Sequence, residues 1–197
     1  MRQKALLVVA ALVAVLLVGA PTAFANNLLA NGSFETGDLS GWTVNAGLID
    51  VVSGPFYDYS AAQDGTFYTV MGDVGSNGTL SQSFSDVAGQ HYTFSFWFAS
   101  VGDNPSDFSA SWDGISVLSL TNPNTGANWS EFSFDVVGTG SDTISFAERD
   151  DPAYMALDNV SVSPVVTTTP EPSSLLLLGS GLLAVGGVIR RKFQANR

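Results

Sequence analysis

Hydrophobic and polar residues alternate one by one along several stretches of the chain. The clearest stretch places four aromatic residues on one side and four other residues, two of them polar, on the other: Tyr92, Phe94, Phe96 and Phe98 against Thr93, Ser95, Trp97 and Ala99. Residues 131–136 and 143–146 alternate in the same way. A period of two residues is typical of a β-strand with one buried face. These stretches therefore predict strands that each offer an apolar face to a core.

Short segments rich in Val, Ile, Phe, Tyr, Thr and Ser fill the rest of the region from 26 to 162. We predict further strands at 28–29, 42–44, 49–52, 67–71, 79–84, 108–112, 115–120 and 155–162. Asp113-Gly114 predicts a tight hairpin, because both residues tolerate a positive φ angle. Two sheets packed face to face would bury the apolar faces. About ten strands at this spacing predict an all-β fold, a two-sheet jelly-roll β-sandwich that forms one domain at 26–164.

Residues 1–25 have the composition of a secretory signal peptide. Two basic residues precede an apolar stretch at 5–18, and Ala23-Phe24-Ala25 meets the small-x-small rule of signal peptidase, with Ala23 and Ala25 as the small residues. We expect cleavage after Ala25 and a mature chain that begins at Asn26. The alternative is a retained membrane helix, for which the apolar stretch is short.

The end of the chain predicts a single membrane span. Residues 165–169 form a linker, and Pro170-Glu171-Pro172 follows it. Next come seventeen uncharged residues, 173–189, and then three bases, Arg190, Arg191 and Lys192. A helix of seventeen residues is roughly 25 Å long, at the short end of what crosses a bilayer. Because Lys and Arg favour the cytoplasmic side, we expect the sandwich on the outer side.

This three-part tail, residues 170–197, resembles the PEP-CTERM sorting signal of Gram-negative bacteria that make extracellular polysaccharide. The resemblance implies that an exosortase, a membrane cysteine protease, cuts the chain near the Pro-Glu-Pro triplet. It also implies export across the inner membrane, anchoring there on the periplasmic side, and sorting to the cell surface or extracellular matrix. The alternative is an ordinary C-terminal membrane anchor.

Charge restricts the partners of the sandwich. Residues 26–169 contain 17 acidic residues and one base, Arg149, a net charge of −16. Nucleic acid and anionic lipid are therefore excluded as partners of this domain, since phosphate contacts depend on Lys and Arg. Neutral polymers and divalent cations remain compatible. The chain has no cysteine, which excludes disulfides, thiol catalysis and thiolate metal sites.

A second resemblance covers essentially the whole predicted domain. It rests on the segment 27–35, Asn-Leu-Leu-Ala-Asn-Gly-Ser-Phe-Glu, on Gly41-Trp42, on Asp64-Gly65-Thr66-Phe67-Tyr68, and on 157–162, Leu-Asp-Asn-Val-Ser-Val. These look like the opening, middle and closing parts of carbohydrate-binding-module-like, or galactose-binding-like, jelly rolls. In the resembled modules, acidic residues of the terminal strands commonly hold a structural calcium ion. Here those residues would be Glu35 and Asp158, with Asp64 as a further ligand.

The alternative for these three acidic residues is that they cap turns or accept hydrogen bonds from backbone N–H groups. Two close carboxylates without a cation would repel each other and raise one pKa. The two alternatives stay open at this point.

Trp97 is the main candidate for sugar binding, because it shares the polar side of its strand with Thr93 and Ser95. A flat indole ring among hydroxyl groups suits a stacked pyranose. Tyr57 and Tyr59, in the 54–60 loop, are candidates for the rim of such a site. The alternative is a Trp97 covered by the loop at 103–106. Trp42, Trp112 and Trp129 are expected in the core or at the ends of a sheet.

Catalysis has little support in the sequence. His91 is the single histidine, and no nucleophile motif surrounds a serine. Glu148, Asp150 and Asp151 around Arg149 suggest a salt-bridged loop rather than a glycosidase pair. We therefore expect a non-enzymatic surface protein that associates with extracellular polysaccharide. The alternatives are a purely structural matrix protein without a defined sugar ligand and a polysaccharide hydrolase.

Overall fold

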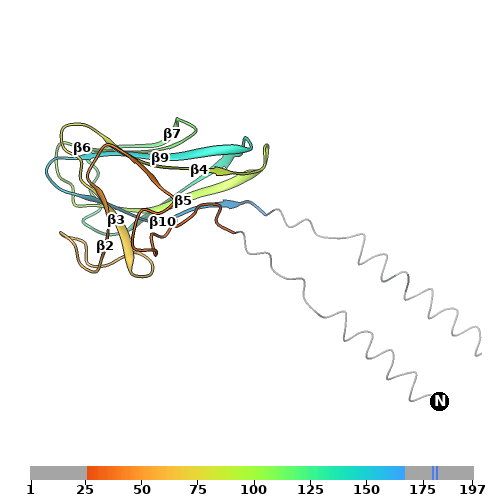
Figure 1. Cartoon of the computed structure of the whole chain (residues 1–197), viewed down its shortest axis with the longest axis horizontal. Coiled ribbons are helices and arrows are strands. Elements are labelled where there is room, and N and C mark those ends of the chain that lie inside the picture. Colours follow the sequence, from red (N-terminus) through yellow and green to blue (C-terminus); the bar gives the residue numbers. More distant parts are fainter. Residues whose placement is uncertain (1–25, 167–178, 180, 182–197) are drawn as a thin grey trace, which may run out of the picture. The chain divides into compact units, whose positions relative to one another are not determined.

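The computed structural model describes residues 26–166, together with 179 and 181. Ten strands in this region form two five-stranded antiparallel sheets. Sheet A runs in the order β1 (Thr43–Asn45), β4 (Gly78–Ser85), β9 (Ser141–Asp150), β6 (Ser106–Trp112) and β7 (Ile115–Thr121). Sheet B runs in the order β2 (Ile49–Ser53), β3 (Phe67–Met71), β10 (Met155–Pro164), β5 (His91–Ser100) and β8 (Ser130–Val137). Figure 1 shows the sheets as two layers, with β4, β6, β7 and β9 in one and β2, β3, β5 and β10 in the other.

The predicted all-β sandwich is confirmed, and so is the alternation that predicted it. Along β5 the four aromatic residues are buried and the residues between them, up to Trp97, are partly exposed. The β6–β7 hairpin turns at Asp113 and Gly114, with φ angles of 48° and 77°. Both residues lie in the left-handed region that this type of turn requires.

The predicted strand at 28–29 is wrong. The N–H of Leu28 donates to the carbonyl of Val162 at 2.9 Å, so the segment does run beside β10. The chain then turns through residues 30–33, with Asn31 at a φ of 51°. The contact is too short for a ladder to form.

The main core lies between the sheets and is dominated by phenylalanine. Phe96 and Phe98 of β5 meet Phe108 of β6 and Phe146 of β9 across the interface. The ring centroids of Phe98 and Phe108 are 4.3 Å apart, and those of Phe96 and Phe146 are 5.0 Å apart in an edge-to-face arrangement. Burial of this aromatic area provides most of the driving force for closing the two sheets.

A second hydrophobic cluster lies on the outer face of sheet B. Ala99 and Ala156 pair directly, next to the core pair of Phe98 and Leu157, and successive residues of a strand face opposite sides. The two alanines therefore face outward, where they pack with Tyr59, Tyr68 and Val70. Tyr59 comes from the loop between β2 and β3, residues 54–66, which thus covers part of this face.

The beginning and end of the described sandwich lie side by side. The amide of Asn27 donates to the carbonyl of Val160, and its side-chain oxygen accepts from the N–H of Val162, both at 2.9 Å. The N–H of Val165 donates to the carbonyl of His91. Residue 26 and residue 165 therefore leave the fold at the same end.

Several predictions fall outside the described residues: the signal peptide 1–25 with its cleavage site at Ala23 and Ala25, the motif Pro170-Glu171-Pro172, and the basic cluster Arg190, Arg191 and Lys192. Most of the predicted span at 173–189 also falls outside them. In the part of the chain that the structure describes, no helix has the length and hydropathy needed to cross a membrane.

Candidate functional site

Strands β10 and β5 and the edge strand β8 of sheet B place a block of polar side chains around Trp97 on the outer face. Trp97 pairs directly with Asp158 of β10 and Glu131 of β8, and residues that pair directly lie on the same side of a sheet. The next two pairs along the strands, which in β10 follow a register shift between Asp158 and Ser161, repeat this arrangement with mostly smaller side chains. We call these nine residues the outer strip: Trp97, Ser95 and Thr93 of β5, Asp158, Ser161 and Ser163 of β10, and Glu131, Ser133 and Asp135 of β8.

The outer strip has the size and chemistry of a small polar platform. With strands about 4.8 Å apart and side chains of one face about 6.8 Å apart along a strand, it measures roughly 10 Å by 14 Å. Its β8 residues are exposed, while Trp97, Ser95 and Thr93 are partly exposed. At the far end His91 Nδ1 lies 2.9 Å from the carboxylate of Asp135. The strip thus combines one accessible indole ring with hydroxyl and carboxylate groups.

Trp97 is partly exposed, and its direct neighbour on β10, Asp158, lies under a loop. The loop segment at Gln63 and Asp64 passes over Asp158, the direct neighbour of Trp97, and both backbone N–H groups donate to the Asp158 carboxylate. The loop that the sequence suggested as a cover, 103–106, is anchored at the β9–β10 turn, where the N–H of Asp151 donates to the carbonyl of Pro105.

The structure separates the two tyrosines predicted for the rim. Tyr57 is 55 % exposed and its ring meets that of Tyr154 at 5.7 Å. Tyr59 is 1 % exposed, and its hydroxyl donates to the carbonyl of Tyr154 at 2.5 Å. Its side chain holds the 54–66 loop against sheet B, so Tyr59 does not line a rim. Of the two loop tyrosines, Tyr57 is exposed and Tyr59 is buried, and their spacing in the sequence did not reveal this difference.

Glu35 and Asp158 both accept hydrogen bonds from the backbone of the loop segment at 63–67. Glu35 Oε1 accepts hydrogen bonds from the N–H groups of Thr66 and Phe67, both at 2.8 Å. Asp158 Oδ2 accepts from those of Gln63 and Asp64, at 2.8 and 3.1 Å. Asp158 is fully buried. Burial raises the pKa of its carboxyl to about 6 despite these hydrogen bonds, and the nearby charge of Glu35 adds to the rise.

The two carboxylates accept hydrogen bonds from backbone N–H groups, which is the alternative that the sequence left open beside a calcium site. Gly65 sits between them in the loop, and a Cβ on it would lie 2.4 Å from the Glu35 carboxyl group, so the loop backbone and this carboxylate approach closely. Asp64 is exposed and contributes its backbone N–H. Among the described residues, no three His, Cys, Asp or Glu side chains are placed to hold one metal ion. A calcium ion here would take Glu35, Asp158 and backbone carbonyl oxygens as ligands.

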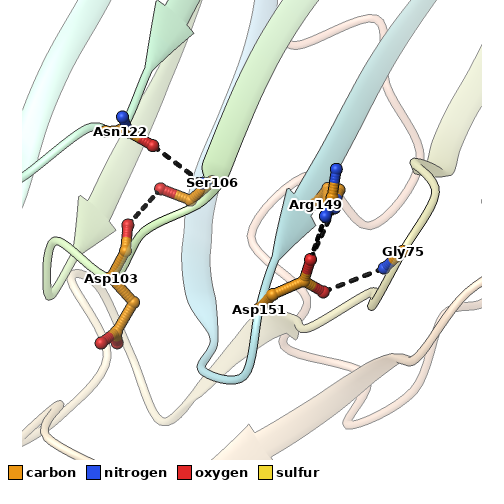
Figure 2. A network of polar contacts seen from close by, with 6 residues as sticks. All are labelled: Gly75, Asp103, Ser106, Asn122, Arg149 and Asp151. Carbon is orange, nitrogen blue, oxygen red and sulfur yellow. Dashed lines mark hydrogen bonds and ion pairs between the residues drawn. The ribbon is translucent and has the colours of Figure 1, made fainter.

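The acidic residues around Arg149 are only partly the salt-bridged loop that the sequence suggested. Figure 2 shows Arg149 paired with Asp151, whose other oxygen accepts from the N–H of Gly75 at 2.9 Å. Glu148 and Asp150 instead point into the protein and are fully buried. The alternation of β9 explains the difference, because residues 148 and 150 share the inner face with Phe146, whereas Arg149 lies on the outer face.

The same figure shows what fixes the 103–106 loop. The hydroxyl of Ser106 donates to the carbonyl of Asp103 at 2.6 Å, and the N–H of Ser106 donates to the side-chain oxygen of Asn122 at 2.9 Å.

Sequence reasoning missed the residue that anchors the 54–66 loop to β8. Trp129 packs edge-on against Tyr68 at 5.8 Å, and its indole N–H donates to the carbonyl of Ala61 at 3.1 Å. It also missed the contribution of β8 and β10 to the outer strip. The polar side of 131–135 was visible in the sequence, but its position beside Trp97 depends on strand pairing that no local pattern encodes.

Comparison with known proteins supports both parts of the chain. Residues 168–192 match the PEP-CTERM protein-sorting motif. The tail therefore carries this sorting signal, which implies export and processing by an exosortase. A search of curated proteins found no match.

The sandwich is similar to solved carbohydrate-binding modules. One is TmCBM61 in complex with beta-1,4-galactotriose, at 20% identity and a TM-score of 0.56, covering 71% of this chain and 99% of that one. Another is the CBM22-1 xylan-binding domain of Paenibacillus barcinonensis Xyn10C, at 19% identity and a TM-score of 0.52, covering 73% and 97%.

A cyclase from Fischerella sp. TAU, in complex with 4-(1H-indol-3-yl)butan-2-one, is also similar, at 14% identity and a TM-score of 0.54, covering 74% and 100%. At these identities the similarity shows the fold. The same β-sandwich thus occurs in sugar-binding modules and in an enzyme.

Proposed function

We propose that this is an exosortase-sorted surface protein whose sandwich binds a neutral extracellular polysaccharide without catalysis. The observation that carries the proposal is the partly exposed ring of Trp97 in the outer strip, among hydroxyl and carboxylate groups. Signal peptidase would remove residues 1–25, and exosortase would process the tail. Before that step, the tail would hold the domain at the inner membrane with the sandwich outside.

The physics of sugar recognition supports the outer strip as the binding surface. A pyranose ring has an apolar face that stacks on indole, while its hydroxyl groups need partners at its edges. Ser95 and Thr93 lie on the same strand as Trp97, and Glu131 and Ser133 lie beside them.

Charge indicates which polysaccharides would bind. The outer strip carries three carboxylates, and residues 26–169 carry a net charge of −16. Polymers rich in uronic acid or sulfate would be repelled, whereas neutral sugars would not. The proposed ligand is therefore a neutral polysaccharide of the host matrix.

We assign a calcium ion to Glu35 and Asp158 as a support for this surface. When bound, the ion would neutralise the two carboxylates that hold the 63–67 loop. Asp158 is the direct neighbour of Trp97. Glu35 and Asp158 would fix residues 63 and 64 over Asp158. This would keep the exposed fraction of the Trp97 ring constant.

The experiment is affinity electrophoresis of residues 26–165 in gels with and without host exopolysaccharide. All ten strands and both hydrophobic clusters lie in this segment. The test variant is Trp97→Ala. The matched control is Tyr57→Ala, which removes another exposed aromatic ring, outside the strip. Thermal unfolding of each variant confirms that it folds.

We expect the polysaccharide to retard the unmodified segment and the Tyr57→Ala variant but not Trp97→Ala. Retardation lost only in Tyr57→Ala would move the site to the loop rim. No retardation of the unmodified segment would favour the structural matrix protein without a sugar ligand. Release of reducing ends from the polysaccharide would favour a hydrolase.

A further inference from the structure

Two acidic side chains meet inside the sandwich where β9 of sheet A comes close to the end of β3 of sheet B. Glu148 lies on the inner face of β9, and Asp73 follows β3 after one residue. Glu148 is fully buried and Asp73 is 7 % exposed. The two residues are in direct contact, because the backbone N–H of Asp73 donates to the Glu148 carboxylate. This position is separate from the outer strip and from Glu35 and Asp158.

The surrounding backbone is built to accept this pair. The N–H of Asp73 donates to Glu148 Oε1 at 3.1 Å, and the N–H of Leu48 donates to Asp73 Oδ1 at 2.7 Å. Two glycines make room for the Asp73 carboxylate: a Cβ would lie 2.1 Å from Asp73 Oδ2 at Gly47 and 1.6 Å from it at Gly78. The pair thus connects the β1–β2 turn, the end of β3 and strand β9.

Within the described part of the chain, one oxygen of each carboxyl group has no partner. Asp73 Oδ2 and Glu148 Oε2 are both buried and accept no hydrogen bond. A buried carboxylate oxygen without a partner costs several kcal/mol, so two of them side by side require an explanation.

Among the described residues, no positive charge faces the pair from the elements packed around it. Arg149 lies on the opposite face of β9 and pairs with Asp151. On the inner face, the next titratable group along β9 is Asp150, which is itself acidic and fully buried. The neighbouring segments 45–48 and 76–79 contain no titratable residue. Two carboxylates in such a place cannot both be ionised without strong repulsion.

We propose that Asp73 and Glu148 share one proton and act as a pH-sensitive latch between the two sheets. The protonated carboxyl donates its O–H to the other carboxylate, which gives both unpartnered oxygens a bond. A metal ion is the weaker explanation, because no three metal-ligating side chains come together in the described part of the chain. Loss of the proton leaves two adjacent negative charges and loosens this end of the sandwich.

The direction of the pH dependence follows from burial. Burial, together with the neighbouring Asp73 carboxyl, raises the pKa of Glu148 to about 9 from its ordinary 4.5. The folded chain therefore holds the proton more tightly than the unfolded chain. The stabilisation is fully present below the unfolded pKa of 4.5 and is lost as the pH rises through about 9. Burial also raises the pKa of Asp150, to about 6, so its titration is largely complete by about pH 7.

The test measures the midpoint of thermal unfolding of residues 26–165 between about pH 7 and about pH 9, with EDTA present. We expect the midpoint to fall by roughly 5 to 10 °C over this range. Glu148→Gln should abolish most of this fall and unfold at a higher temperature than the unmodified segment at about pH 9. The glutamine amide replaces the protonated carboxyl as donor to Asp73, and its oxygen still accepts from the Asp73 N–H.

Two further variants keep the test decisive. In Asp73→Asn the asparagine amide donates to Glu148, so this variant should also reduce the fall of the unfolding midpoint with pH. It tests the proposal even if Glu148→Gln does not fold. Asp150→Asn should leave the fall between about pH 7 and 9 in place. The proposal is overturned if both of the first two variants unfold in parallel with the unmodified segment across the range. It is also overturned if calcium in excess of EDTA restores the midpoint at high pH in the unmodified segment but not in Glu148→Gln. The two carboxylates would then share a metal ion and not a proton.

Discussion

The outer faces of the two sheets follow the same alternation of residues but have different compositions. The outer face of sheet A carries small hydroxyl side chains that bond within their own sheet: Ser83 with Thr143, Ser109 with the carbonyl of Ala147, and Ser111 with that of Ser145. The outer face of sheet B carries Trp97, a buried cluster around Tyr59, and the 54–66 loop.

This difference separates two tasks that a sandwich face can perform. On the face of sheet A, these hydroxyl groups already have hydrogen-bond partners within the sheet. The face of sheet B buries aromatic area outside the main core and leaves one indole ring accessible at the edge of the covered part. Substitutions on each face should show whether the two faces also contribute differently to the free energy of unfolding.

The largest effect is expected for Tyr59→Ala in the covered part of sheet B. Removing a fully buried aromatic side chain typically costs about 3 to 5 kcal/mol of unfolding free energy. Chemical denaturation of residues 26–165 measures it. Tyr59→Phe, which removes only the hydroxyl donor to the Tyr154 carbonyl, should cost about 1 kcal/mol. Equal losses in both variants would contradict a packing role for the ring.

A somewhat smaller effect is expected from calcium. At about one hundred times the dissociation constant, a ligand of the folded state stabilises it by about 2.7 kcal/mol. The midpoint of thermal unfolding should therefore rise with calcium and fall back with EDTA. Because burial raises the pKa of Asp158 to about 6, the calcium-dependent rise should shrink as the pH falls below about 6, where the carboxyl is protonated.

Two variants sharpen the calcium prediction. Glu35→Gln and Asp158→Asn should each reduce the difference between the calcium and EDTA midpoints, whatever they do to the midpoint itself. Asp64→Asn should reduce the calcium-dependent difference in midpoint less than the other two variants. Asp64 contacts Asp158 through its backbone N–H, which this substitution leaves in place. A calcium response that survives in the first two variants would place the ion elsewhere.

Trp97→Ala should have a modest effect on stability, about 1 kcal/mol, because the ring is only partly buried. Trp129→Ala is the matched comparison on the same face. Trp129 is also only partly buried, but it packs on Tyr68 and its indole N–H donates to the carbonyl of Ala61, so its loss should cost more, about 2 kcal/mol. Comparable losses for the two variants, measured by denaturation, would show that Trp97 is a packing residue rather than an accessible one.

The smallest effect is expected on sheet A. Ser83→Ala removes an exposed hydroxyl that bonds to Thr143 and should change the unfolding free energy by no more than about 0.5 kcal/mol. It should also leave retardation by polysaccharide unchanged. A loss of binding in this variant would show that the hydroxyl-rich face, and not the outer strip, contacts the ligand.

The sequence predicted those features that depend on local pattern. The period of two around Phe96, the left-handed turn at Asp113-Gly114 and the two-layer fold all follow from side-chain size and backbone freedom over a few residues. The nearness of Glu35 and Asp158 also follows, because the opening segment and the closing strand run side by side. The predicted sorting motif is confirmed by the match at 168–192.

Features that depend on long-range packing could not be predicted. The burial of Tyr59 arises because a loop folds back over a sheet formed from strands distant in sequence. The inward direction of Glu148 depends on the register of β9. The charged sequence around Arg149 is as typical of an exposed loop as of a strand with buried carboxyl groups. Strand order, which places Glu131 and Asp158 on either side of Trp97, has no local signature.

The adjacency of residues 26 and 165 makes this fold nearly a closed circle. Joining them through a short glycine linker and opening the chain at the tip of the β6–β7 hairpin should give a permuted domain with the same sandwich. In the natural chain, both ends of the sandwich leave it on one side, so removal of the segments beyond residues 26 and 165 would leave both broad faces unchanged.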